Sequence, residues 1–323
     1  MKNIIINILK IIGLYQTHKV PFKISENFTK LSSHEKNKIL ELTNTYCKKE
    51  SYKTNKSRQT DIDALSYGRL NRFRKTHIPF LGEKVDLKGK KILEIGCGSG
   101  SSSVALSEQG AFITGIDIDE KALSFAKKRA KIYNQNITFI KSNAVNLDKL
   151  KKEDWDIIIY FASLEHMTPI ERKKSLSQAF TILKKGAHLC VFGTPNRLWP
   201  VDIHTSQLPF YMWLQDDIAL DYAKFSSRKE FSEISNNENG NINLLYRWGR
   251  GVSFHEFHNS FGEIKPINVV GSLPIFLRKH SLIQKLSYKR SREYKYKSAL
   301  KNYGPKNIHP GFYECYLDII IKV

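Results

Sequence analysis

The chain of 323 residues has few cysteines and no paired arrangement of them. The four stand far apart, so their spacing indicates neither a disulfide framework nor a zinc site: Cys47, Cys97, Cys190 and Cys315. We therefore predict no metal centre and a reducing compartment, in which thiols stay free. Internal repeats and low-complexity tracts are missing from the sequence as well, which favours ordinary globular domains.

Long hydrophobic runs are also missing. The apolar start "MKNIIINILKIIGLY" is interrupted by Asn7 and Lys10, so it falls short of the roughly 18–20 residues that span a membrane. No small-residue cleavage site follows, and no signal peptide is expected. Asn3, Asn7 and Lys10 form one polar stripe on an isoleucine-rich helix. Such a helix packs on the domain or lies on a membrane surface, so we predict a cytoplasmic protein with membrane association left open.

Acidic residues are scarce relative to basic ones, and the net charge is +21. Residues 273–306 hold ten Lys and Arg against one acid, interleaved with four tyrosines, whereas residues 197–272 hold seven against nine. The basic piece suits nucleic-acid phosphates, an anionic membrane, a solvated face or an oligomer contact. In an enzyme that acts on nucleic acid, the basic surface would be expected to continue across the substrate site, whereas residues 197–272 have a net negative charge. Nucleic acid is therefore disfavoured as a partner.

From residue 90 the chain alternates strands and helices. Strands are expected at 90–96, 111–117, 137–143, 155–162 and from 188, the last after a helix that ends at Gly186. A helix at 253–262 and strands at 263–270 and 312–323 complete the pattern. Residues 1–84 are helical, with Ser33 as one helix N-cap and Lys36 at N3, hence no capping box. The alternation predicts a parallel, doubly wound sheet.

The predicted organisation has four parts. Residues 1–84 form a helical N-terminal extension, and residues 85–196 form an α/β core. Residues 197–252 are an inserted lid, and residues 253–323 complete the core around a basic insertion at 273–306.

A glycine-rich turn follows the first strand. Gly96, Gly98 and Gly100 let the backbone approach a ligand at a helix N-terminus. Their G-x-G-x-G spacing differs from the G-x-G-x-x-G dinucleotide fingerprint. Asp117 ends the second strand, where a carboxylate accepts both hydroxyls of a ribose.

The sequence resembles the class I S-adenosylmethionine (SAM)-dependent methyltransferases over residues 86–196 and 253–323. "ILEIGCGSG", "GIDIDEKAL" and "DWDIIIYFASLEHM" match three of their motifs. The resemblance implies a Rossmann-like sheet of seven strands, the last antiparallel, with SAM as cofactor. By the same resemblance Glu94, Gly96 and Gly98 line the methionine part, Asp117 holds the ribose, and Ile118 lies against the adenine. Asn143 stands where many relatives have an aspartate. The implied cofactor residues are Glu94, Gly96, Cys97, Gly98, Gly100, Asp117, Ile118, Asn143, Ala144 and Phe161.

Methyl transfer from a sulfonium is an in-line displacement that depends on alignment of donor and acceptor. A hydroxyl acceptor also needs a group that takes its proton. Glu165 and His166 follow the fourth strand in "SLEHM", and "LEH" is a common ending in small-molecule members of the family. His204 is the other candidate base. His166 has a structural alternative, as a cap of the following turn or a neighbour of the cofactor.

The stretch "TPNRLWPVDIHTSQLPFYMWL" (194–214) follows the fifth strand. Its aromatic rings suit stacking on sugars, although they also suit an aromatic plug that packs the insert on the sheet. Its form looks like that of methyltransferases from bacterial glycan and natural-product pathways. We therefore predict O-methylation of a sugar, a lipid-linked saccharide or another small molecule. The candidate acceptor residues are Asn196, Trp199, Asp202, His204, Phe210 and Trp213.

The sequence lacks the residues expected for two kinds of nucleobase methylation: at the amino group of adenine or cytosine, and at carbon 5 of a pyrimidine. The fourth strand leads into "FASLEH" rather than an Asp/Asn-Pro-Pro-aromatic run, and Cys190 lies inside an apolar strand instead of serving as a nucleophile. An RNA methyltransferase is kept as the alternative enzyme. A SAM-binding protein without catalysis is the alternative outside the enzymes.

Overall fold

The computed structural model describes residues 28–51, 54–236, 241–261, 267–288, 291–304 and 308–323. The predicted amphipathic helix at the start of the sequence lies outside these residues. Within them, every helix is too short or too polar to cross a membrane.

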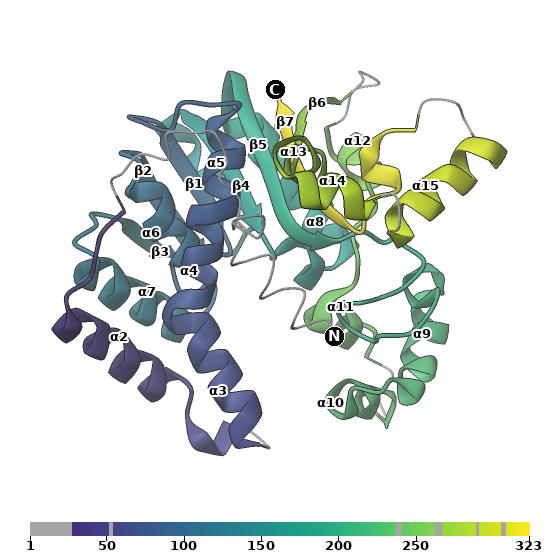
Figure 1. Ribbon diagram of the computed structural model, residues 1–323, viewed down its shortest axis with the longest axis horizontal. Helices are drawn as coiled ribbons and strands as arrows, with labels where there is room; N and C mark the ends of the chain where they lie inside the picture. The colour runs from purple at the N-terminus through teal and green to yellow at the C-terminus, as the bar shows by residue number, and fades with distance from the viewer. Residues whose placement is uncertain (1–27, 52–53, 237–240, 262–266, 289–290, 305–307) are drawn as a thin grey trace.

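One sheet of seven strands organises the molecule, in the order β3-β2-β1-β4-β5-β7-β6 (Figure 1). Strands β1 to β5 run parallel, and β7 is antiparallel to both β5 and β6. This confirms the predicted doubly wound sheet with an antiparallel last strand. The strands are β1 (Lys91–Ile95), β2 (Phe112–Asp117), β3 (Thr138–Lys141), β4 (Trp155–Phe161), β5 (Leu183–Pro195), β6 (Asn268–Ser272) and β7 (Tyr316–Lys322).

Strand β4 shows why helices cover both faces of the sheet. Successive side chains of a strand point to opposite faces. Ile157 and Ile159 accordingly enter one core, with α5 (Ile78–Gly82) and α6 (Ser101–Ser107), whereas Ile158 and Tyr160 enter the other, with α8 (Pro169–Ile182) and α12 (His255–Phe261). All four side chains are fully buried, as in a strand covered on both sides. Helix α7 (Glu120–Ile132) packs beside β3 over a smaller cluster.

The N-terminal extension is helical, as predicted, but one cap was predicted wrongly. Helix α2 (Ser33–Tyr46) begins after Ser32, whose hydroxyl accepts the Glu35 N–H while the Glu35 carboxylate accepts the Ser32 N–H. The helix therefore has a capping box at Ser32 and Glu35, whereas the Ser33 and Lys36 pattern predicted an N-cap one residue later and no capping box. The shift satisfies one further N–H group, that of the N-cap residue, which a lysine at N3 could not accept.

A nearly continuous helix covers residues 55–82 (Figure 1). It comprises α3 (Asn55–Asp63), α4 (Arg69–Arg72) and α5, joined by two π-helical turns at Ala64–Gly68 and Phe73–His77. Each π turn contains one residue more than an α-helical turn closed at the same place. We call this run the cover helix.

The boundary between α8 and β5 also differs from the prediction. The helix ends at Ile182 instead of Gly186, and β5 begins at Leu183, which pairs with Trp155 of β4. Gly186 lies inside the strand with a φ of +79° and donates its N–H to the Val323 carbonyl. Pairing with β4 and β7 thus outweighs the local helical pattern of this segment.

Two insertions interrupt the core after β5 and after β6. Residues 197–252 contain α9 (Asp216–Tyr222), α10 (Lys229–Ser232) and α11 (Asn243–Gly249) around a small core of their own. The basic insertion forms α13 (Leu273–His280), α14 (Leu282–Tyr288) and α15 (Arg292–Tyr303), and α15 buries no residue. Short 3-10 helices lie at Lys49–Ser51, Leu147–Glu153, Leu164–His166, Tyr211–Trp213, Ala223–Phe225, Glu233–Asn236 and Pro310–Phe312.

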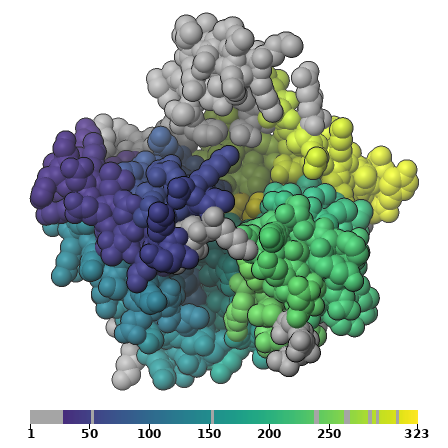
Figure 2. Space-filling model, turned by 90° about the horizontal axis from the view of Figure 1, so that it is seen from below, coloured from purple at the N-terminus to yellow at the C-terminus, as the bar shows by residue number. Residues whose placement is uncertain are grey.

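The N-terminal helices and the insert lie on opposite sides of the lower face (Figure 2). In Figure 1 both extend below the edge of the sheet at which the parallel strands end. In open α/β sheets, ligands bind at this edge. The two added segments therefore flank the place where a site is expected.

Candidate functional site

A cleft of about 860 Å³ opens at the carboxyl ends of the parallel strands. The glycine-rich turn and the ends of β2 and β3 line one half, which we call the cofactor half. The end of β4, the insert and the start of β7 line the other, which we call the acceptor half. The cover helix contributes Arg69, Arg72 and Phe73 to the lining.

The glycine-rich turn presents bare backbone to the cleft. Gly96 has a φ of +75°, and a Cβ there would lie 2.6 Å from the Cβ of Ser163. Gly98 has a φ of +49° with open space where a side chain would stand. Its N–H donates to Asp117 Oδ2 at 2.8 Å. A ligand can therefore approach this backbone closely, beside a carboxylate at the end of β2.

The other predicted cofactor residues divide into lining and supporting positions. Cys97, Ile118, Asn143, Ala144 and Phe161 line the cleft. Ile118 is 65% exposed, as suits a flat apolar contact. Asn143 Oδ1 accepts the Val145 N–H at 3.1 Å, so this amide oxygen is already used once to hold the loop.

Glu94 and Gly100 lie behind the turn instead of on the cleft surface. Glu94 is fully buried, and its two carboxyl oxygens accept the hydroxyls of Ser102 and Ser103. Burial raises its pKa to about 7. Gly100 caps α6 with a φ of +72°, close to Ala126. Both residues hold the start of α6 against the turn.

A buried arginine that sequence analysis missed links three elements. Arg129 of α7 is fully buried, and its guanidinium donates to the Ser99 carbonyl at 2.8 Å and to the Ser101 hydroxyl. It also donates to the Leu65 carbonyl in the first π turn of the cover helix. In the sequence it is one cation in "KKRAK", with nothing to distinguish it from its exposed neighbours. The fold makes it the tie between the glycine-rich turn and the cover helix.

Two histidines face the acceptor half from different segments. His166 ends the 3-10 turn after β4 and His204 belongs to the insert, and both line the cleft with ring centroids 6.2 Å apart. Reciprocal contacts bind His166 to α11: its Nδ1 lies 3.0 Å from the Arg247 carbonyl, and Arg247 Nη1 donates to the His166 carbonyl at 2.7 Å. Burial lowers the pKa of each histidine, so both favour the neutral form.

Glu165 lies behind His166 and does not line the cleft. It is fully buried, its Oε2 accepts the Thr194 hydroxyl at 3.2 Å, and its Oε1 is 4.0 Å from His166 Nε2. Among the described residues Oε1 has no hydrogen-bond partner. Burial raises the pKa of Glu165 to about 7.

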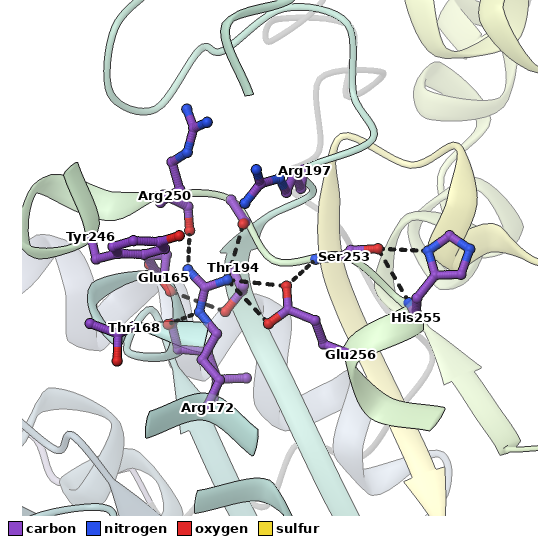
Figure 3. Close-up of polar contacts among 12 residues, drawn as sticks. Glu165, Thr168, Arg172, Thr194, Arg197, Tyr246, Arg250, Ser253, His255 and Glu256 are labelled. Atoms are coloured by element: carbon purple, nitrogen blue, oxygen red, sulfur yellow. Dashed lines mark hydrogen bonds and ion pairs between the residues drawn. The ribbon is translucent and has the colours of Figure 1, made fainter. Parts of the chain in front are cut away.

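Arg172 fixes this turn to the point where the insert returns to the core (Figure 3). Its guanidinium, fully buried, donates to the Leu164 carbonyl at 3.0 Å, to the Arg250 carbonyl at 2.6 Å and to the Glu256 carboxylate at 3.1 Å. The Arg250 N–H donates to the Glu165 carbonyl at 2.9 Å. The candidate catalytic turn and the insert are therefore one hydrogen-bonded unit.

Of the predicted acceptor residues, the structure brings only His204 to the cleft lining. The Asn196 amide donates to the Gly311 and Glu314 carbonyls, and Asp202 accepts the N–H groups of the three residues after Ile203. Trp199 is buried against Tyr296. Phe210 and Trp213 pack edge to face on the surface, about half exposed. These side chains shape the insert.

The cleft also contains residues that sequence analysis did not assign. They are Arg69, Arg72, Met167, Glu171, Gly193, Arg247, Tyr316 and Asp318, besides neighbours of the predicted positions. The arginines of the cover helix lie in the extension, which the family motifs do not reach. Tyr316 and Asp318 stand at the start of β7, more than 140 residues after His166 in the sequence.

Comparison with known proteins agrees with this geometry. The family model for a methyltransferase domain matches residues 92–186, which hold the glycine-rich turn, Asp117 and His166. Residues 92–186 therefore form a class I SAM-dependent methyltransferase domain, with SAM as its cofactor. The bare glycine backbone beside Asp117 fits that cofactor.

Particular relatives can be named. The ubiquinone biosynthesis O-methyltransferase of Coxiella burnetii is 29% identical over 193 residues, which is 59% of this chain and 79% of that protein. The enzyme of the same name from Pseudomonas fluorescens is 31% identical over 120 residues, 37% of this chain and 50% of that one.

Solved structures resemble parts of the chain. The PH0226 protein of Pyrococcus horikoshii has a TM-score of 0.38 at 27% identity and covers 41% of this chain and 57% of that one. Magnesium protoporphyrin IX methyltransferase of Synechocystis with bound SAM has a TM-score of 0.37 at 21% identity and covers 52% of this chain and 80% of that one.

Proposed function

We propose that this methyltransferase O-methylates a hydroxyl group of a small molecule, with His166 as the base. The observation that carries the proposal is the fixed tautomer of His166. A backbone carbonyl only accepts hydrogen bonds, so the contact between His166 Nδ1 and the Arg247 carbonyl requires the proton on Nδ1. In the neutral ring Nε2 is then the atom with a free lone pair.

Glu165 is placed to stabilise His166 when its Nε2 is protonated. When Nε2 takes a proton, a positive charge develops 4.0 Å from Glu165 Oε1. A carboxyl whose pKa burial has raised to about 7 ionises more readily beside such a charge. The imidazolium and the carboxylate then stabilise each other, while the Thr194 hydroxyl holds the second oxygen. Glu165 is thus a positioning residue, since it does not reach the cleft.

Bound SAM supplies a methyl group on a positively charged sulfur, and the chain supplies alignment. The acceptor half lies beside the glycine-rich turn, between the cover helix and the insert. Holding the acceptor there replaces a bimolecular encounter with an oriented one, which accounts for much of the acceleration in such transfers.

The nature of the acceptor follows from the cleft and the relatives. Two relatives are named for O-methylation in ubiquinone biosynthesis, which supports a small-molecule hydroxyl. A sugar remains one such hydroxyl, but the aromatic residues that suggested it, Trp199, Phe210 and Trp213, do not line the cleft. The basic helices α13–α15 contribute no residue to the cleft lining either, so nothing in the site favours RNA.

The test measures methyl transfer from labelled SAM to panels of phenols and saccharides. His166→Ala is expected to lower kcat by about 10²–10⁴-fold, with SAM affinity unchanged by calorimetry. Because burial lowers the pKa of His166 below the ordinary histidine value of 6.5, kcat/KM should stay high near pH 6.5 and fall only at lower pH. Transfer to nitrogen or sulfur instead of oxygen, or full activity of the His166→Ala enzyme, would contradict the proposal.

A further inference from the structure

Two arginines of the cover helix reach the cleft without a protein partner. Arg69 and Arg72 are exposed and three positions apart, so they share one side of the helix. Both line the cleft. Within the described part of the chain, neither guanidinium makes a hydrogen bond or an ion pair. By contrast Arg247, the third arginine of the lining, is bound to Glu171 at 2.8 Å and to the His166 carbonyl.

The two arginines lie near different titratable groups. The charge of Arg69 acts on Tyr46, as do the charges of Asp119 and of Asp117, which lines the cleft at the end of β2. The charge of Arg72 acts on Tyr316 and Asp318 of β7. Arg72 therefore belongs to the acceptor half, where His166 and His204 also lie.

Beside Arg72 the start of β7 offers a second donor. Tyr316 is half-buried, and burial raises its pKa to about 12, so its hydroxyl keeps its proton. No described residue accepts that hydroxyl. Asp318 is the nearby acid: its Oδ1 accepts the Gly193 N–H at 2.6 Å, and burial raises its pKa to about 6 while Arg72 lowers it. Among the described residues Asp318 forms no ion pair with Arg72, so the guanidinium stays available to a ligand.

We propose that the methyl acceptor carries an acidic group, a carboxylate or a phosphate, and that Arg72 and Tyr316 bind it. This inference rests on the proposed O-methylation. A guanidinium and a phenol hydroxyl are matched donors for such an oxyanion, and arginine binds it through two parallel bonds. Bound SAM carries one more positive than negative charge, which further favours an anionic acceptor over an amine in a partly enclosed cleft.

The experiment compares acids with their neutral counterparts. The probes are 3,4-dihydroxybenzoate and glucuronate, each against its methyl ester, and glucose 1-phosphate against methyl glucoside. Methyl transfer from labelled SAM is expected to favour the acid by about 10- to 100-fold in kcat/KM, the strength of a charge-assisted contact. Arg72→Ala should bring that ratio close to one, Arg72→Lys should restore part of it, and Tyr316→Phe should lower it less. The matched control is Lys75→Ala, which removes an exposed cation of the same helix outside the cleft lining.

Two further measurements separate the possible failures. Calorimetry should give Arg72→Ala the wild-type affinity for SAM; a loss of tenfold or more with an unchanged acid preference would mean that Arg72 serves the cofactor carboxylate, and would overturn the proposal. The same titration with the acids, on protein loaded with S-adenosylhomocysteine, should show binding that depends on Arg72. Equal or better use of the neutral probes, or no binding of any acid, would also overturn it. Acid binding that needs Arg72 without transfer to oxygen would instead refute the proposed O-methylation.

Discussion

The two halves of the cleft are built in different ways. The cofactor half comes mainly from a short part of the sequence, residues 95–118, and presents backbone and one carboxylate. The acceptor half is assembled from the cover helix, the turn after β4, the insert and the start of β7, which are far apart in the sequence. Members of the family share one cofactor, so backbone contacts from one motif can serve all of them. The acceptor half instead presents side chains from many segments. The difference explains why a family motif identifies the cofactor and leaves the acceptor open.

The largest effect expected on the cofactor half is that of Asp117→Ala. It removes the carboxylate that we expect to bind the ribose hydroxyls and also the acceptor of the Gly98 N–H. Each charge-assisted hydrogen bond contributes about 1.5–3 kcal/mol, so SAM affinity should fall by about 100-fold or more in calorimetry. Asp119→Ala is the control, since that exposed carboxylate caps α7 outside the cleft lining. Equal affinities of the two variants would refute the ribose assignment.

An intermediate effect is expected where the two halves are tied together, at Arg129. Arg129→Met keeps the length of the side chain but leaves the Ser99 and Leu65 carbonyls without their donor, at a cost of about 1–3 kcal/mol for each unpaired buried group. We expect a lower Tm and about tenfold weaker SAM binding, because the glycine-rich turn loses its support.

Hydrogen exchange distinguishes this positioning role from general destabilisation. Faster exchange should be confined to residues 64–72 and the glycine-rich turn, at a temperature where both proteins are folded. Uniformly faster exchange with unchanged SAM affinity would show that Arg129 only stabilises the fold.

The smallest effect is expected from the exposed aromatic pair of the insert. Phe210 and Trp213 lie outside the cleft lining, so Phe210→Ala and Trp213→Ala should each change kcat/KM by about twofold or less, as is usual for surface substitutions of about 0.5 kcal/mol. A loss of tenfold with either variant would extend the acceptor half to the outer surface of the insert.

The sequence predicted those features of the fold that are determined by residues close together in the chain. The strand alternation predicted the sheet because each strand and helix has its own hydrophobic period. The glycine-rich turn and Asp117 were predictable because they are adjacent in one motif. Local competition produced the errors: at residues 183–186 strand pairing outweighed a helical pattern, and at Ser32 and Ser33 two equivalent caps stood side by side.

The acceptor half shows what the sequence could not reveal. Asn196 and Asp202 are polar residues next to a strand end, which is the pattern of a binding residue. Their partners are backbone groups of segments that only folding brings near. Arg72 shows the reverse case, because it is an ordinary cation in a basic helix until the cover helix packs over the cleft.

The two π turns of the cover helix have a consequence for how this enzyme tolerates changes in length. An α-helix rotates by about 100° per residue, so each extra residue changes the angular phase of everything beyond it. Because α5 is anchored by the fully buried Phe80 and Leu81, deleting one residue from the turn at Phe73–His77 would turn Arg72 away from the acceptor. A deletion in the turn at Ala64–Gly68 would leave Arg72 in place, but it would rotate α3 and displace the Leu65 carbonyl that accepts from Arg129. The length of one turn thus bears on the proposed acid binding by Arg72, and the length of the other bears on the tie between the cover helix and the glycine-rich turn.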